Sequence, residues 1–438
     1  GDILLSDALC AGGIELVLMD VVADRLHAPL RFAQQLATRL GRDARITAST
    51  VMADAVAGAT YVITAIEVDR YYRWAQDFHI PRKYGFTQIY GENGGPGGLF
   101  HALRNMGPML EIARAMEQQC PDAWLVNYSN PEAKLVQAIS TLTSVKTVGM
   151  CHGVFMGRNQ VSRLLQIPEE EIETVPCGLN HFSWFQSIRH RATGEDLYPL
   201  LRERERQAQW LASWDELALN RILFRTYGLW PYPGTNHAGE YLRWSNEFMA
   251  CTNLQYFYDP ASEHPWQTHE VPTFVYDLGG KPTEIPLFAA EQVKQVYPPF
   301  EKRVLDSDGT VSPSGEEGIQ ILDAFAGGGR RAIATVNVPN RGAIPDLPGD
   351  MVVEVPAVAD TDGLHVQQLE RLPTGITAML QLQGNINRLL VEAYAECSRR
   401  KLLQAVLIDP TVSTYANAVA MIDEMFDLQK ELLPPLVW

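Results

Sequence analysis

Ile14-Glu15-Leu16-Val17-Leu18-Met19-Asp20 is the stretch that decides the fold, because it predicts a buried strand closed by an acidic residue. A helical pattern over 31–38 follows it, and Ala44–Ala48 predicts a second strand. Further strands are predicted at 60–65, 124–127 and 145–149. Strands separated by helices imply right-handed crossovers and a parallel sheet. We therefore expect an α/β fold that begins with a Rossmann-type, doubly wound parallel sheet.

A long helix is predicted between the third and fourth strands, opening at Gly97-Gly98. Apolar side chains recur along it at helical spacing, which is typical of a core-facing stripe. They are Phe100, Leu103, Met106, Leu110, Ala113 and Met116.

The strand–helix alternation fades after about residue 155, and the rest of the chain predicts an α+β arrangement. Helices are expected at 215–224, 286–297, 377–401 and 413–432, and short strands at 332–337 and 352–355. A chain of 438 residues exceeds one typical core. We predict a dinucleotide-binding domain over 1–155, and an α+β domain for substrate, metal and oligomerisation over 156–438.

The glycine-rich turn that opens most dinucleotide-binding folds is missing from this sequence. Gly1-Asp2-Ile3-Leu4 resembles the remainder of the helix that should follow such a turn. Either the first strand and its loop are absent from this chain, or the fingerprint was never there. Asp20 favours the first alternative, because it ends a strand where a carboxylate would bind the adenosine ribose. An acid at a strand end is otherwise common.

Composition excludes several classes of function. The formal charge is -16 and no Lys or Arg run stands out, which excludes a nucleic-acid partner. No window approaches the roughly 18 apolar residues of a membrane span, and no signal peptide opens the chain. Six scattered cysteines are typical of reduced intracellular thiols. We expect a soluble, cytoplasmic enzyme with neither a nucleic-acid nor a membrane partner.

Two segments that follow predicted strands carry polar groups suited to chemistry. Asn127 to Glu132 places two amides at the carboxyl edge of the sheet, where such folds bind ligands, although an Asn-Pro turn with its caps explains the same residues. Cys151 and His181 come from separate loops, and a thiolate with an imidazole can hold a divalent ion and leave positions open for substrate. An inert core cysteine and a hydrogen-bonded histidine are the alternatives.

With these motifs in order, the chain resembles glycoside hydrolase family 4, the NAD- and divalent-metal-dependent glycosidases. The motifs are Gly91–Gly98 with Arg104, Asn127–Pro131, Cys151-His152, Gly178–His181, and Val336–Gly342 followed by Leu347-Pro348 and Val353–Pro356. The resemblance implies NAD and Mn²⁺ as cofactors, Cys151 and His181 as metal ligands, and Asn130 as a substrate contact.

The resemblance also implies a mechanism other than the usual paired carboxylates. The sugar is oxidised transiently at C3 by NAD, its C2 proton is removed with help from the metal, and the aglycone leaves by elimination before water adds. Tyr232 is the candidate base, with Tyr227 and His237 as rivals. His152 is the candidate acid, with Glu92 as the alternative, because some family members carry Asp where this sequence has His152.

Further residues are predicted to bind the cofactor or the substrate. Asp20, Glu92 and Asn127 are predicted to contact the cofactor, and Asn180 and His237 the substrate. The stretch 227–241 is similar to the α-galacturonidase branch, so a guanidinium should hold a sugar carboxylate, with Arg104 preferred over Arg225 and Arg341. Arginines that tie the two lobes together are the alternative explanation.

Other functions stay open from the sequence. A 6-phospho- or neutral α-glucosidase or α-galactosidase of the same family is one alternative. A hydroxy-acid dehydrogenase and a non-catalytic sugar-binding protein are two others. The expected partner is a small-molecule glycoside, and the expected assembly is a homodimer or homotetramer.

Overall fold

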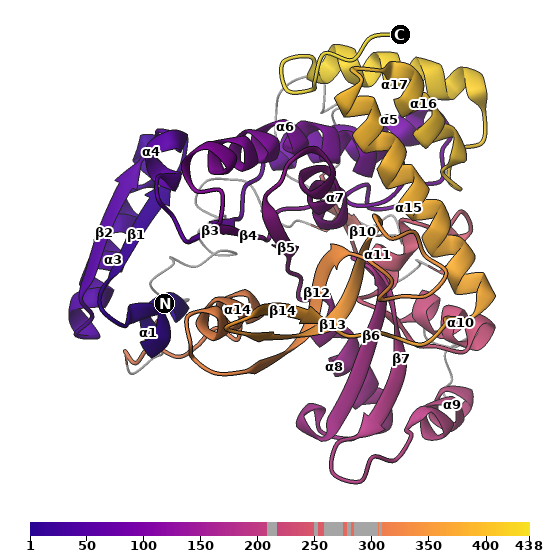
Figure 1. Cartoon of the computed structure of the whole chain (residues 1–438). Helices are drawn as coiled ribbons and strands as arrows, with labels where there is room; N and C mark the ends of the chain where they lie inside the picture. The colour runs from indigo at the N-terminus through magenta and orange to yellow at the C-terminus, as the bar shows by residue number, and fades with distance from the viewer. Residues whose placement is uncertain (208–216, 249–252, 258–274, 278–281, 284–304, 306–308) are drawn as a thin grey trace.

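The computed structural model describes the chain except for residues 208–216, 249–252, 258–274, 278–281, 284–304 and 306–308. The predicted helix at 286–297 lies outside the described residues. Figure 1 shows helices covering a large mixed sheet, with the carboxyl-terminal helices gathered at one end of the molecule.

The five predicted strands of the first part are confirmed. They are β1 (Ile14–Met19), β2 (Ala44–Ser49), β3 (Tyr61–Thr64), β4 (Trp124–Asn127) and β5 (Lys146–Gly149). Pairing is parallel between β1 and β2 and along β3-β4-β5. β1 does not pair with β3, so the single parallel sheet that we expected is split into two. Among the described residues, no strand pairs with both β1 and β3, so the two sheets are not joined.

The helices of the first part begin at the amino terminus itself. Gly1–Leu4 was predicted to be helical, and α1 spans Asp2–Leu5. The others are α2 (Asp7–Cys10), α3 (His27–Arg39), α4 (Met52–Val56), α5 (Arg70–Lys83), α6 (Gly95–Gln119), α7 (Glu132–Leu142) and α8 (Gly153–Leu165). All six residues of the predicted apolar stripe on α6 have no exposed surface, which confirms them as core.

The parallel strands continue directly into an antiparallel sheet. β5 pairs with β12 (Arg331–Pro339) through Gly149 and Asn337, and the strand order is β3-β4-β5-β12-β13-β6-β7-β8. The remaining members are β13 (Val352–Asp360), β6 (Ile172–Leu179), β7 (Phe182–His190), β8 (Pro231–Tyr232) and β14 (Gly363–Val366), which pairs with β13. The sequence predicted β12 and part of β13, but not the long β6–β7 hairpin. The predicted domain boundary at 155/156 stays a prediction.

Smaller elements complete the second part. They are α9 (Tyr198–Gln207), α10 (Ala218–Tyr227), α11 (Thr235–Gly239), α14 (Glu317–Phe325), and a three-stranded antiparallel sheet of β9 (Asn253–Phe257), β10 (Val275–Asp277) and β11 (Pro282–Thr283). The helix predicted at 215–224 corresponds to α10, and its first two predicted residues lie outside the described part of the chain.

Three helices at the carboxyl terminus pack on α5, α6 and α7, and their apolar faces join the core around α6. They are α15 (Thr374–Ala395), α16 (Arg399–Ile408) and α17 (Tyr415–Gln429). The single helix predicted at 377–401 is wrong, because Cys397 has a left-handed backbone (φ 52°) that ends one helix before the next begins.

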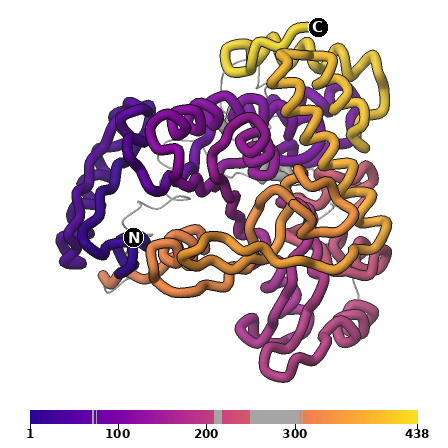
Figure 2. Tube along the Cα trace, viewed as in Figure 1, coloured from indigo at the N-terminus to yellow at the C-terminus, as the bar shows by residue number. Residues whose placement is uncertain are grey.

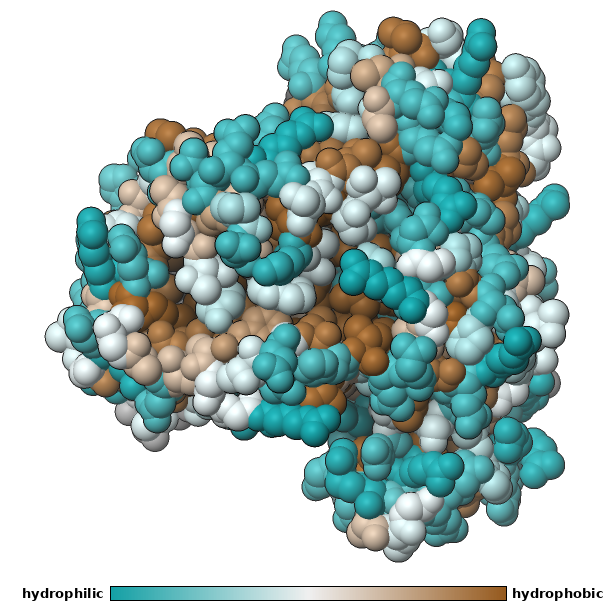
Figure 3. Space-filling view, viewed as in Figure 1, coloured by the Kyte–Doolittle hydropathy of each residue, from teal (hydrophilic) through white to brown (hydrophobic). Residues whose placement is uncertain are grey.

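Segments distant in sequence meet near the amino terminus. Asp2 accepts hydrogen bonds from Ser314, and Ser6 donates one to Asp323 on α14. Figure 2 shows this juxtaposition, with the carboxyl terminus at the far end of the molecule. On the face seen in Figure 3, hydrophobic side chains gather in a hollow between the β1–β2 sheet and the rest of the protein.

Candidate active site

His181 stands at the tip of the β6–β7 hairpin. Leu179 pairs with Phe182, which leaves Asn180 and His181 to form the turn. His181 is 7% exposed and has φ 63°, an uncommon backbone conformation for a residue with a side chain. Such strain is concentrated at functional sites, where the surrounding structure holds it in place.

Three further side chains converge on His181. The His237 ring lies 4.2 Å from the His181 ring between centroids, and one ligand atom from each of His181, His237, Glu92 and Glu240 lies within 4.8 Å of the others. His237 belongs to α11, Glu240 follows that helix, and Glu92 precedes α6. The fold therefore brings together Glu92, His181 and His237, which the sequence nominated for three different roles, and adds Glu240.

Glu240 also binds the loop that opens α6. Its Oε2 atom accepts hydrogen bonds from the backbone N–H groups of Glu92, Asn93 and Gly94, at 2.9, 2.6 and 2.7 Å. A helix amino terminus favours a carboxylate in this position. A Cβ on Gly94 would lie 2.7 Å from the Glu240 Cβ, so this approach requires glycine. Burial raises the pKa of Glu240, and His237 opposes the shift.

Cys151 follows β5, and its thiol contacts the Asn180 side chain. The Gly153 N–H donates to its Sγ at 3.4 Å. Burial raises the pKa of the thiol to about 12 and Glu354 adds to the shift, whereas hydrogen bonds from Gly153 and Asn180 oppose it. A metal ligand must be the thiolate, so in the protein alone this cysteine is held protonated. Cys151 is not part of the four-residue group around His181.

Two buried carboxyl groups lie beside Cys151, and the sequence reasoning did not single out either of them. Glu354 on β13 accepts hydrogen bonds from the Tyr232 hydroxyl at 2.6 Å and the Asn180 amide at 3.2 Å. Glu132 opens α7, is 1% exposed, and neither of its carboxyl oxygens has a hydrogen-bond partner. Burial raises the pKa of both groups, and the charge of Glu354 raises that of Glu132 further.

Tyr232, the predicted base, is fully buried and stacks on Phe185 at 4.6 Å between ring centroids. Burial, followed by the charge of Glu354, raises the pKa of Tyr232 well above its ordinary value. An activated tyrosine base would need a pKa shifted in the opposite direction. The hydroxyl is a hydrogen-bond donor to Glu354 in this environment.

Two other predicted catalytic residues do not join the cluster. The His152 side chain is 62% exposed and pairs through Nε2 with Glu316 at 2.6 Å, which raises its pKa. Tyr227 ends α10 and packs against Gly375 at the start of α15, since a Cβ there would lie 2.9 Å from the tyrosine ring. The ion pair with Glu316 explains the position of His152, and packing against Gly375 explains that of Tyr227.

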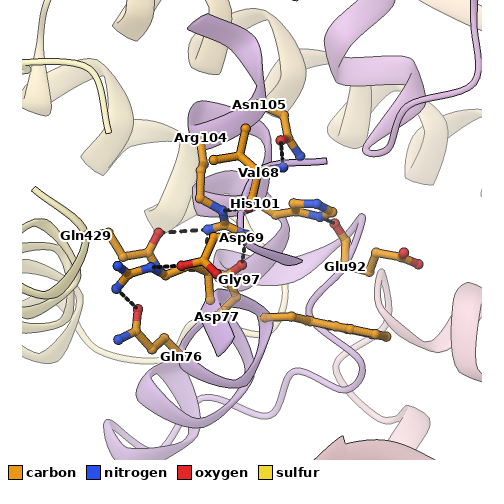
Figure 4. A network of polar contacts seen from close by, with 12 residues as sticks. Val68, Asp69, Gln76, Asp77, Glu92, Gly97, His101, Arg104, Asn105 and Gln429 are labelled. Carbon is orange, nitrogen blue, oxygen red and sulfur yellow. Dashed lines mark hydrogen bonds and ion pairs between the residues drawn. The ribbon is translucent and has the colours of Figure 1, made fainter. Parts of the chain in front are cut away.

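Arg104, the predicted substrate-binding arginine, is engaged by the protein itself, so its surroundings give that prediction no support. Its side chain is fully buried and forms a bidentate pair with Asp77 at 3.2 and 2.7 Å. It also donates to Gln429 at 2.7 Å and to the Val68 carbonyl at 3.2 Å (Figure 4). These contacts tie α6 to α5 and α17. Arg225 instead pairs with Glu205 at 2.6 Å.

The remaining predicted ligand-binding residues lie at strand ends, as expected. Asp20 follows β1 and accepts the Val22 N–H at 2.8 Å. Asn127 ends β4. Its amide oxygen accepts hydrogen bonds from the Thr64 hydroxyl and the Ser129 N–H, and its amide nitrogen donates to the Ser129 carbonyl. These bonds stabilise the turn that follows the strand. The Asn130 carbonyl accepts from Asn105 at 3.0 Å.

A buried cation also lines this region. Lys134 on α7 is 4% exposed and donates to the Asn93 carbonyl at 2.5 Å. Burial lowers its pKa to about 8, and the carboxylates of Glu240 and Asp409 oppose that shift. With Asn93, Asn180 and Tyr241 it lines a cavity of about 10 Å³, room for one water molecule. No charge pattern in the sequence set this lysine apart.

Comparison with known proteins identifies the family. The model of family 4 glycosyl hydrolases matches residues 1–167, and that of the family's C-terminal domain matches residues 176–412. This chain belongs to glycoside hydrolase family 4. It is 30% identical to an α-glucosidase of Erwinia rhapontici over 99% of this chain and 95% of that protein. It is 28% identical to an α-galacturonidase of Thermoanaerobacter italicus over 87% of this chain and 83% of that protein.

Solved structures of glycosidases share the fold. A 6-phospho-α-glucosidase from gut microorganisms, in complex with NAD and Mn²⁺, matches with a TM-score of 0.75 at 22% identity, over 99% of this chain and 95% of that one. A 6-phospho-β-glucosidase from Thermotoga maritima, with NAD and glucose-6-phosphate, gives 0.72 at 19% identity over 99% and 95%.

The predicted family, fold class and enzyme class are thereby confirmed, and the chain is a family 4 glycosidase. Across the part of the chain that the structure describes, no helix combines the length and apolarity needed to cross a bilayer.

Proposed function

We propose that this glycosidase cleaves an α-hexoside by transient oxidation of the sugar at C3, with NAD and a divalent metal as cofactors. The observation that carries the proposal is the buried polar site around His181, which adjoins the loop opening α6 and is flanked by Cys151 and Asn180. Imidazole and carboxylate groups in one buried site, with a thiol that contacts the neighbouring Asn180, suit a divalent transition metal.

The donor set fits such an ion. His181 would hold it from the hairpin tip, and Cys151 is the second ligand predicted from the sequence. The Glu240 Oε1 atom is buried without a hydrogen-bond partner, as a group that meets a cation would be. When bound, Mn²⁺ supplies Lewis-acid stabilisation of negative charge on sugar oxygens, and NAD supplies a reversible hydride acceptor.

The chain's own residues orient the reactants. Asp20, at the end of β1, is suited to accept hydrogen bonds from the cofactor ribose. Glu240 fixes the loop that carries Glu92, so this carboxylate stays beside His181. Tyr232 and Asn180 hold Glu354 next to Cys151. We assign Tyr232 a positioning role, because its hydroxyl donates to Glu354 and is buried.

An α-galacturonide is the substrate to test first. The stretch 227–241 resembles that branch, and α-galacturonidases stand among the relatives. Arg104 gives this choice no support, since its guanidinium is engaged elsewhere. The relative with 30% identity is an α-glucosidase, so a neutral α-glucoside is the alternative.

Nitrophenyl α-galacturonide, α-galactoside, α-glucoside and their 6-phosphates should be compared with NAD⁺ and Mn²⁺ present. We expect release of nitrophenol with no net rise in NADH absorbance, and a requirement for NAD⁺ in less than stoichiometric amounts. Equal rates without NAD⁺ would refute the redox route. Net NADH production would indicate a dehydrogenase instead.

We further propose a cytoplasmic homodimer or homotetramer. Light scattering of the purified protein measures the assembly directly, and a monomeric mass at working concentration would contradict that part of the proposal.

A further inference from the structure

The group around His181 contains more ligand-type side chains than the two that the sequence predicted for a metal. His181, His237, Glu92 and Glu240 each offer one atom, and these four atoms lie within 4.8 Å of one another. Ligands that surround one ion at about 2.1 Å are separated by at most about 4.2 Å, twice that bond length. Small side-chain movements therefore suffice for all four to reach a common ion.

A second observation points to a ligand in this space. The Glu240 side chain has no exposed surface, and its Oε1 atom has no hydrogen-bond partner. The Nδ1 atom of His237 is buried without a partner as well, and it lies 3.8 Å from Glu240 Oε1, beyond hydrogen-bond reach. Polar atoms buried in this way are costly unless something satisfies them.

The surrounding structure holds these ligands in place. Three backbone N–H groups fix the Oε2 atom of Glu240, so its other oxygen stays directed at His237. The Tyr90 ring packs edge-on against His237 at 5.1 Å between centroids. Support of this kind orients metal ligands and raises their affinity.

We propose that His237, Glu240 and Glu92 are further ligands of the divalent ion that His181 binds, so that the chain holds Mn²⁺ before any sugar is present. Two carboxylates match the charge of a divalent cation and supply the oxygen ligands that Mn²⁺ prefers, and the two imidazoles add nitrogen ligands of the kind that divalent transition metals accept. This inference rests on the proposed function, because it concerns the same ion.

Mn²⁺ binding to the protein alone tests the inference, without NAD or substrate. Titration calorimetry and Mn²⁺ electron paramagnetic resonance should be applied to wild type, His237→Ala, Glu240→Gln and Cys151→Ala. Gln at 240 can still accept the backbone N–H groups through its amide oxygen, so the loop should stay in place. Exposed His365→Ala and Glu247→Gln are matched controls, and circular dichroism checks the fold of each variant.

We expect His237→Ala and Glu240→Gln each to weaken Mn²⁺ binding by at least about tenfold, the range seen when even outer-shell partners of a metal are lost. The control variants should bind as wild type does. Wild-type affinity in both His237→Ala and Glu240→Gln, together with loss in Cys151→Ala, would overturn this inference and leave the proposed function intact. No Mn²⁺ binding by wild type in the absence of NAD and substrate would also overturn this inference, whereas the proposed function would be overturned only by glycosidase activity that needs no metal.

Discussion

Arg104 and Asp77 form a bidentate ion pair in which neither side chain has any exposed surface. Removing one member of such a pair leaves the other charge buried and unpaired, which costs about 3–5 kcal/mol. We expect Arg104→Ala to lower the free energy of unfolding by this amount in urea denaturation. Arg371→Ala, from an exposed pair with Asp346, should change it by less than about 1 kcal/mol. A normally stable Arg104→Ala enzyme that selectively loses uronide turnover would restore the original prediction.

Tyr232→Phe separates a base from a positioning residue. The phenylalanine ring keeps the stack on Phe185 but removes the donor to Glu354. Leaving a buried acceptor with one bond fewer should cost about 1–3 kcal/mol of stability, with activity retained in part. Steady-state kinetics and denaturation measure the two effects, and Tyr415→Phe, 66% exposed, is the control. Undiminished stability with abolished turnover would identify Tyr232 as the base.

Replacing Glu132 by glutamine should stabilise the folded protein, and the gain should depend on pH. Its folded pKa is raised, so above the unfolded value near 4.5 the unfolded chain ionises while the folded protein keeps its proton. Stability therefore falls with rising pH, by up to about 1.4 kcal/mol per pH unit, until the folded pKa is reached. Glu132→Gln removes this loss.

Denaturation of metal-free protein at pH 4 and pH 8 checks the effect. Glu132→Gln should exceed wild type in stability at pH 8 by more than at pH 4, whereas exposed Glu195→Gln should show no such difference. The same stability difference at both pH values would contradict a raised pKa.

Gly94→Ala tests the loop that Glu240 binds. The new methyl group would lie 2.7 Å from the Glu240 Cβ, so the loop must move. The hydrogen bonds from its backbone N–H groups to Glu240 must then lengthen. A displacement of about 1 Å at a site can cost on the order of 10²-fold in rate. We expect a loss of kcat/KM of this size, against little change in Gly349→Ala, where no atom lies within 4 Å of the added Cβ. Equal activity of the two variants would rule out tight positioning by this loop.

Metal removal is the last prediction. Dialysis against a chelator should abolish glycosidase activity, and added Mn²⁺ should restore it, because the ion stabilises charge on the sugar. Cys151→Ala should remain inactive after Mn²⁺ is added if the thiolate is a ligand. Persistent activity in chelator would exclude a metal-dependent reaction.

Periodicity predicted the elements whose signals are local. The strands β1 and β4 and the core stripe of α6 were found because apolar residues follow one another or recur at helical spacing along the sequence. β4 is buried as such a run predicts, whereas β1 is only half-buried, because it lies in a two-stranded sheet with β2. The β6–β7 hairpin was missed because Pro176 and Gly178 interrupt the pattern of β6 and because the turn contains no Asn-Gly pair. The split between β1 and β3 depends on long-range pairing, which no local pattern records.

The site was predicted in part for the same reason. His181 and Cys151 follow strands, and a motif draws attention to them. Glu240 lies three residues after His237, a spacing that could have been noticed. Glu354 is an acidic residue flanked by apolar residues within β13, which is also a visible signal. Glu132 and Lys134 have shifted pKa values only because they are buried against other segments. The ion pair of Arg104 with Asp77 likewise depends on contacts between segments that no local pattern records.

Gly149 and Glu132 adjoin so closely that each limits the size of the other. A Cβ at Gly149 would lie 1.2 Å from the Glu132 Oε1 atom, so the carboxyl group already occupies the volume that any larger residue would need. Position 149 also joins the parallel strands to the antiparallel ones through Asn337, and it precedes Cys151 by two residues. Sequences of this lineage should therefore show the two positions changing together, with a side chain at 149 appearing only where 132 has become small.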